Sequence, residues 1–227
     1  MAVLSSITHY PVKRVQTRLT VIRHGETDWN VEGRIQGHQE SELNERGRRQ
    51  AAALDGCFEA GSADAVYSSD LRRTMDTARP VADALGLEIR RDKRLREWNL
   101  GCMEKMLLSE ARLRVPDAIR IYDERLVDAV VPGGESIRKR YERFTACLVE
   151  VANRHAGGHA VVVTHGGILD DIYKFVHRLD LDVPCEWELF NCGINRLTKA
   201  GETWRADVWG EVRHLDGIGS MTTWNER

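Results

Sequence analysis

The sequence lacks any long apolar run, and this absence limits the kinds of protein it can encode. In 227 residues, no stretch approaches the roughly 18 consecutive apolar residues of a membrane-spanning helix. Residues 1–17 show no basic segment followed by a long apolar one, so we interpret them as a flexible lead-in and not as a secretory signal. We therefore expect a cytoplasmic protein that does not bind a membrane.

Cysteine is scarce, and its spacing does not suit a structural role. The five cysteines form no Cys-x-x-Cys pair and are odd in number, which argues against a disulfide framework or a zinc knuckle. Neither an EF-hand loop nor a His-Glu-x-x-His pattern is present. The sequence therefore predicts no metal site and no cofactor.

A strong charge of one sign is also missing. The net charge is −2, and 33 basic residues are dispersed among 35 acidic ones, which gives no extended positive field for a nucleic acid. Any anion site must therefore be local. The length and the hydrophobic content of 42% are typical of one globular domain with a sizeable core, which we place at residues 18–227.

Strands alternate with helices along the chain, which predicts an α/β fold: a three-layer α/β/α sandwich with a mostly parallel central sheet. Apolar strands are expected at residues 19–22, 65–67, 87–89 and 160–163, with two more between 188 and 212. Helical spacing is found at residues 45–58, 71–85, 137–151 and 167–179.

Punctuating residues refine this outline. Asn44 is a candidate helix cap, Gly86 a candidate helix end, and Pro80 is expected to kink or split its helix. Residues 101–131 contain a helical stretch broken at Pro116. We expect them to form a small helical cap above the carboxyl end of the sheet.

Two copies of one short pattern, an apolar strand that runs directly into His-Gly, are the most informative feature that is present. They end at His24-Gly25 and at His165-Gly166. Ligands of an open α/β sheet collect at the carboxyl ends of its parallel strands, so the two histidines can face one crevice. Glycine after each histidine allows a tight turn and a close approach to a ligand.

Four segments carry side chains suited to phosphoryl chemistry. Arg23 can bind phosphate oxygens with its fork, and the adjacent His24 can attack phosphorus. Arg72 stands in the first turn of a predicted helix, and Glu97 is a candidate general acid. His165 could donate to a phosphoryl group beside a helix N-terminus. Taken singly, His24 beside Arg23 could equally be an ordinary core or surface residue, and Arg72 and Glu97 would more often be surface charges.

In this order and at these separations, the four segments resemble the histidine phosphatase superfamily, which includes the cofactor-dependent phosphoglycerate mutases. The resemblance extends from residue 19 to about residue 215. Further matches are Asp28-Trp29-Asn30, Arg34-Ile35-Gln36-Gly37, Leu43-Asn44-Glu45-Arg46-Gly47, Thr74-Met75-Asp76-Thr77-Ala78 and Pro132-Gly133-Gly134-Glu135-Ser136.

The resemblance implies a role for each matching residue. It makes His24 the phosphoryl acceptor and Glu97 the proton donor to the leaving oxygen and later the base on water. The clamp on the transferring group would consist of Arg23, Arg72 and His165. Phosphate or substrate contacts are implied for Asn30, Gln36, Gly37 and Gly166. Phosphoryl transfer needs charge neutralisation and in-line geometry above all, which these side chains can supply without a metal ion.

Within this family, the sequence favours a phosphatase of a small phosphorylated metabolite over a mutase. A glycolytic mutase has a long insertion after its acid glutamate, with a tyrosine and a lysine near its start. Here that stretch is short, with Trp98-Asn99-Leu100 in place of the tyrosine and Leu108 near the position of the lysine. Losing those contacts favours release and hydrolysis. The alternatives are a phosphoglycerate mutase and a low-activity interaction module, and a monomer and a homodimer remain equally open.

One departure from the family pattern affects the cap. Relatives often have Trp-Glu-Gly a few residues after the glutamate, whereas this chain reads Cys102-Met103-Glu104-Lys105. The cap also contains cations that could bind a second anionic group, although a solvated helix face is the simpler interpretation. These cations are Lys105, Arg112, Arg114 and Arg120.

Overall fold

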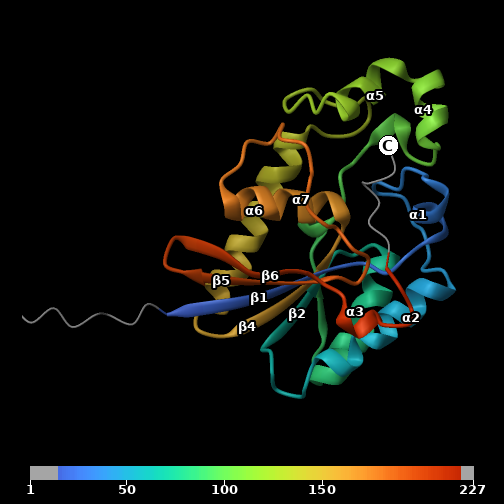
Figure 1. Cartoon of the computed structure of the whole chain (residues 1–227). Helices are drawn as coiled ribbons and strands as arrows, with labels where there is room; N and C mark the ends of the chain where they lie inside the picture. Colours follow the sequence, from blue (N-terminus) through green and yellow to red (C-terminus); the bar gives the residue numbers. More distant parts are fainter. Residues whose placement is uncertain (1–14, 221–227) are drawn as a thin grey trace, which may run out of the picture.

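The computed structural model describes residues 15–220, whose centre is a six-stranded sheet in the order β3-β2-β4-β1-β5-β6 (Figure 1). The strands are β1 (Gln16–Arg23), β2 (Ala65–Ser68), β3 (Ile89–Arg91), β4 (His159–Thr164), β5 (Ile194–Ala200) and β6 (Thr203–Glu211). The first four strands are parallel, and β5 and β6 are added antiparallel.

Helices cover both faces of this sheet, so the predicted three-layer sandwich is confirmed. They are α1 (Asp28–Glu32), α2 (Glu45–Ala53), α3 (Arg72–Leu85), α4 (Leu108–Arg114), α5 (Pro116–Asp123), α6 (Ile137–Arg154) and α7 (Gly166–His177). In Figure 1, α6 and α7 lie on one face and α2 and α3 on the other. Alternation along β1 explains the two cores, because Leu19 and Val21 pack with α6 and α7 while Ile22 packs with α3.

Several local predictions hold and one is wrong. The Asn44 side chain accepts the Gly47 N–H at 2.8 Å, and Gly86 ends α3 with φ 68°. Pro80 does not split α3, because its neighbours Ala78 and Val81 are fully buried and their packing outweighs one missing hydrogen bond. The lead-in was placed too far along the chain, since Gln16 already begins β1; residues 1–14 lie outside the described part.

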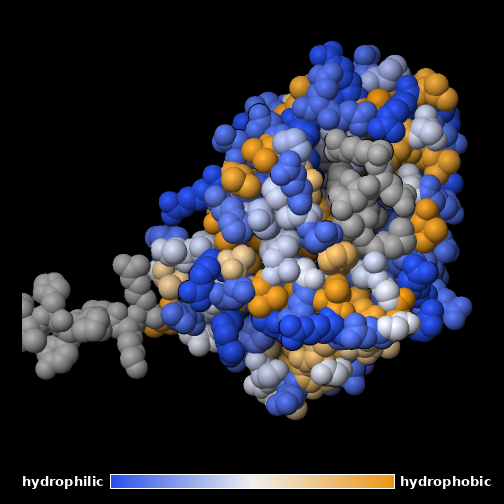
Figure 2. Space-filling model, in the orientation of Figure 1, coloured by the Kyte–Doolittle hydropathy of each residue, from blue (hydrophilic) through white to orange (hydrophobic). Residues whose placement is uncertain are grey.

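The segment predicted as a cap forms α4 and α5, with Pro116 as the first residue of α5. Its apolar side chains join a third cluster that is separate from the two sheet cores and includes Trp98, Leu100, Met103, Ala111 and Ile119. The cap stands above the sheet in Figure 1, and Figure 2 shows mainly hydrophilic side chains over its outer surface. Within residues 15–220, no helix has both the length and the apolar character needed to span a membrane.

Candidate active site

The two His-Gly turns lie side by side because β1 and β4 are adjacent parallel strands whose last residues, Arg23 and Thr164, are in register. The imidazole rings of His24 and His165 are 5.3 Å apart, edge to face. Beside them, a cavity of about 180 Å³ extends from the strand ends to the cap. The predicted crevice is therefore present, although His165 lies behind His24 and does not itself line the cavity.

His24 has the form that a nucleophile needs. Its Nδ1 lies 2.7 Å from the Gly25 carbonyl oxygen, and since a carbonyl can only accept, Nδ1 carries the hydrogen and Nε2 keeps a lone pair. Burial, together with the charges of Arg73 and Arg23, holds the pKa of His24 well below its usual value. The imidazole is therefore neutral at pH 7, with a free lone pair on Nε2.

His24 is held through Nδ1, whereas His165 is held through Nε2. Its Nε2 lies 2.9 Å from the Ser69 hydroxyl, while Nδ1 is buried and has no hydrogen-bond partner in the described part of the chain. Burial and then the charge of Arg73 lower the pKa of His165. With the Ser69 hydroxyl as donor to Nε2, the hydrogen of the neutral ring is on the buried Nδ1.

Two buried arginines supply positive charge. Arg23 and Arg73 are 3% and 1% exposed, and burial lowers the pKa of each to about 10, so both stay charged at neutral pH. Arg73 donates to the carbonyl oxygens of Gly37 and Gln39, each at 2.8 Å. Its Nε is buried and unpaired among the described residues. Arg73 thus brings a buried positive charge to the cavity that it lines.

The prediction for Arg72 is wrong, because the neighbouring Arg73 occupies the site. The Arg72 side chain is 59% exposed and pairs with Glu42 and Asp76 at the surface. Arg73 lines the cavity and shares a buried helix face with Thr77 and Val81, four and eight residues further on. That helical spacing was the signal in the sequence that could have separated the two arginines.

Glu97 lies between the sheet end and the cap, and backbone groups fix its carboxylate. Oε1 accepts the Trp98 N–H at 2.7 Å, and Oε2 accepts the Gly167 N–H at 2.9 Å. A Cβ on Gly167 would lie 2.3 Å from Oε1, so only glycine fits there. Arg143 donates to the Glu97 carbonyl oxygen at 2.6 Å and holds the segment in place. Sequence reasoning identified Glu97 but neither Gly167 nor Arg143.

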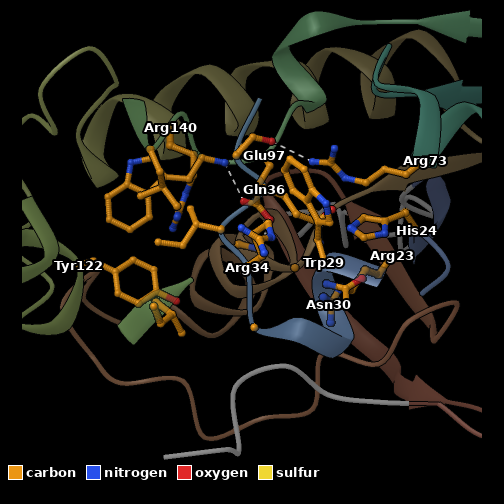
Figure 3. A pocket seen from close by; sticks show the side chains of 18 residues that line it. Arg23, His24, Trp29, Asn30, Arg34, Gln36, Arg73, Glu97, Tyr122 and Arg140 are labelled. Carbon is orange, nitrogen blue, oxygen red and sulfur yellow. Dashed lines mark hydrogen bonds between the residues drawn. The ribbon is translucent and has the colours of Figure 1, made fainter. Parts of the chain in front are cut away.

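The remaining predicted residues also line the cavity. Asn30 closes the first turn of α1, where its side-chain oxygen accepts the Thr27 N–H at 3.1 Å. Gln36 and Gly37 lie on the loop that Arg73 binds, and Gly166 begins α7 directly beside Arg23, as Figure 3 illustrates for the labelled side chains. Each of these four positions therefore borders the space beside His24.

The cap side of the cavity consists of residues to which the sequence assigned no role in the site or only a tentative one. They are Trp29, Arg34, Ile35, Trp98, Leu100, Leu108, Tyr122 and Arg140. None of the four cap cations named from the sequence is among them. Arg112 and Arg120 form surface ion pairs with Asp123 and Glu124, so they belong to a solvated helix face.

Metal-ligating side chains are not clustered at the site, and within the described residues no group of three or more His, Cys, Asp or Glu could hold an ion.

Residues 19–212 match the family described as the histidine phosphatase superfamily, branch 1. The chain belongs to this superfamily. The resemblance inferred from the sequence is thereby confirmed.

Named relatives of this histidine phosphatase include both phosphatases and mutase-like proteins. The chain is 38% identical over 208 residues to phosphoglycerate mutase-like protein 4 of Arabidopsis thaliana, covering 89% of each chain. It is 34% identical over 210 residues to a metal-independent phosphoserine phosphatase of the same plant, covering 90% of this chain and 86% of the relative. The solved structure of Bacillus stearothermophilus YhfR superposes with a TM-score of 0.80 at 32% identity, covering 88% and 99% of the two chains.

Proposed function

We propose that this protein is a metal-independent phosphomonoester hydrolase that acts on a small phosphorylated metabolite through a phosphohistidine at His24. The observation that carries the proposal is the hydrogen bond from His24 Nδ1 to the Gly25 carbonyl, which leaves Nε2 as the free nucleophile. Around it, Arg23 and Arg73 supply positive charge, and the Arg73 Nε and the His165 Nδ1 are buried donors without partners among the described residues.

In the first step, Nε2 of His24 attacks phosphorus, the bond from phosphorus to the ester oxygen breaks, and Glu97 gives its proton to that oxygen. The buried arginines stabilise charge on the equatorial oxygens, and they do so strongly because their guanidinium groups are themselves buried. The alcohol leaves through the cap side of the cavity. His24 then carries the phosphoryl group.

In the second step, water attacks phosphorus on the opposite side while Glu97, now a carboxylate, takes a proton from the water. The bond from phosphorus to Nε2 breaks, inorganic phosphate leaves, and His24 and Glu97 return to their starting states. The same carboxyl group thus serves both steps, which its position between His24 and the cap allows (Figure 3).

Hydrolysis is favoured over mutase activity by the neutral cap side of the cavity. A mutase must retain a bisphosphate while it turns over, which needs free cations for the second anion. Here Arg34 is paired with Glu32 and Arg140 with Asp171, while Leu108 lines the cavity. The phosphatase among the named relatives supports the same choice.

The test is phosphate release from p-nitrophenyl phosphate and 3-phosphoglycerate by the wild type and by His24→Ala, with a chelator present. We expect release that the chelator leaves unchanged and that His24→Ala abolishes. The same reactions are assayed for 2-phosphoglycerate. Isomerisation faster than release would make the protein a mutase, and a chelator-sensitive or His24-independent release would contradict the proposal.

A further inference from the structure

Arg140 of α6 is a buried cation that the proposed reaction does not use. Its side chain is 3% exposed, and its Nε and Nη2 each donate at 2.7 Å to one oxygen of Asp171 on α7, which is fully buried. This two-point contact fixes the plane of the guanidinium. Arg140 nevertheless lines the cavity.

The third nitrogen, Nη1, is the informative one. It has no hydrogen-bond partner among the described residues, although both of the other nitrogens are paired. Nη1 does not belong to the fully buried side-chain atoms that lack a partner, so it is open to the cavity that Arg140 lines. Because Arg140 borders the cavity, the partner of Nη1 can be a bound molecule.

Nη1 lies next to the carboxylate that would protonate the leaving group. A Cβ built on Gly167 would be 3.1 Å from Arg140 Nη1 and 2.3 Å from Glu97 Oε1, so the two groups flank the same point. In Figure 3, Glu97 lies between Arg140 and the pair formed by His24 and Arg73. The carbons that follow an ester oxygen placed at Glu97 are therefore within reach of Nη1.

On its other side the Arg140 guanidinium is bordered by aromatic rings, and its charge is already balanced. The guanidinium lies over the Trp98 ring, 4.9 Å from its centroid, and Tyr122 stacks on the same ring at 5.8 Å. Asp171 neutralises Arg140, so a ligand needs an acceptor atom here but no negative charge. In such surroundings a single directed donor discriminates well between a hydroxyl and a methyl group.

We propose that Arg140 is a specificity-determining residue whose Nη1 binds an oxygen acceptor on the second or third carbon of the leaving group. This rests on the proposed hydrolase function and narrows its substrate class to phosphomonoesters of short polyols and related hydroxylated compounds. The hydrogen bond forms before and during phosphoryl transfer and takes no part in bond breaking.

The test compares esters that differ in this acceptor alone: 2-hydroxyethyl phosphate with propyl phosphate, and 3-hydroxypropyl phosphate with butyl phosphate. A hydrogen bond to a charged donor predicts that kcat/KM favours one hydroxylated ester over its partner by about tenfold. Equal values of kcat/KM in both pairs would overturn the proposal. In that case His24-dependent hydrolysis of p-nitrophenyl phosphate would still support the proposed function. Failure of the Arg140 proposal is therefore distinguishable from failure of the hydrolase proposal.

Two variants assign the preference to Arg140. Arg140→Lys keeps a cation for Asp171 but removes the third nitrogen, and Arg140→Met combined with Asp171→Leu removes both buried charges together. In both variants, the ratio of kcat/KM for the hydroxylated ester to kcat/KM for its alkyl partner is expected to fall close to one, while p-nitrophenyl phosphate is still hydrolysed. Arg138→Met is the matched control, because Arg138 also lies on α6 and also binds a carboxylate with two nitrogens, but at the surface.

The readout separates recognition from a structural role. A purely structural residue would change kcat/KM for both members of a pair by the same factor, and this would overturn the proposal. If Arg140→Lys does not fold, the double variant decides alone, since it leaves no buried charge unpaired. Retention of the wild-type preference in either folded variant contradicts the assignment.

Discussion

The two halves of the cavity use arginine in opposite ways. In the phosphoryl half, formed by Arg23, His24, Asn30 and Arg73, the buried Arg73 bonds to backbone carbonyls and keeps its positive charge for an anion. In the leaving-group half, Arg34 and Arg140 are each paired with a carboxylate among aromatic side chains. The difference indicates a site that binds one phosphoryl group strongly and recognises the rest of its substrate by shape and by single hydrogen bonds.

The largest loss of activity is expected when positive charge is removed from the phosphoryl half. Arg73→Ala should lower kcat/KM for p-nitrophenyl phosphate by 100-fold or more, roughly the effect of losing one donor to a charged transition state. Arg72→Ala is the matched control at the next position and should stay within about twofold, because its side chain pairs only at the surface. Comparable losses in both variants would contradict the placement of Arg73.

The junction between the halves is tested by Glu97→Gln. An alkyl phosphate should lose about 100-fold in kcat, because its alkoxide leaving group requires a proton. With p-nitrophenyl phosphate the first step should persist, since that phenolate is stable without a proton, and slow hydrolysis should then give a burst of one equivalent of p-nitrophenol. Equal losses on both substrates and no burst would count against Glu97 as the acid.

The buried histidines of the phosphoryl half should make the folded protein less stable in acid. His24 and His165 have lowered pKa values in the folded protein, chiefly through burial, so below about pH 6.5 the unfolded chain binds protons that the folded chain does not. Stability should therefore fall with decreasing pH, by about 1.4 kcal/mol per pH unit for each histidine. Urea unfolding at pH 7.0 and 5.5 measures this loss. His165→Gln should make it smaller, and an unchanged loss would contradict the account.

The smallest expected effect lies at the edge of the cap. Lys105 has φ 73°, a left-handed conformation that a side chain disfavours, and it follows Glu104 where the family pattern has glycine. Lys105→Gly should raise the free energy of unfolding by about 1 kcal/mol, measured by urea denaturation. The Lys105 N–H and carbonyl, which bond to Ile35 and Arg34, are unaffected by the change. A destabilised variant would show that this backbone is not strained.

The same two halves differ in how far the sequence could predict them. The histidine turns, the glutamate and most helix boundaries depend on short patterns, and these were predicted with small shifts in position. The choice between Arg72 and Arg73 required helical phase, which was present but not used. The pairs Arg140–Asp171 and Glu97–Gly167 join residues 31 and 70 positions apart. Such contacts depend on how α6 and the segment around Glu97 pack against α7, which no local pattern specifies.

The central claim is the covalent intermediate at His24, and its most direct test is to trap it. Wild type and Glu97→Gln are mixed with p-nitrophenyl phosphate, quenched in base within the first turnover, digested and mapped by mass spectrometry. The account predicts phosphate on the peptide that contains His24, stable in base, lost in acid and more abundant in Glu97→Gln. Phosphate on another residue, or hydrolysis with no phosphoenzyme in either protein, would contradict it.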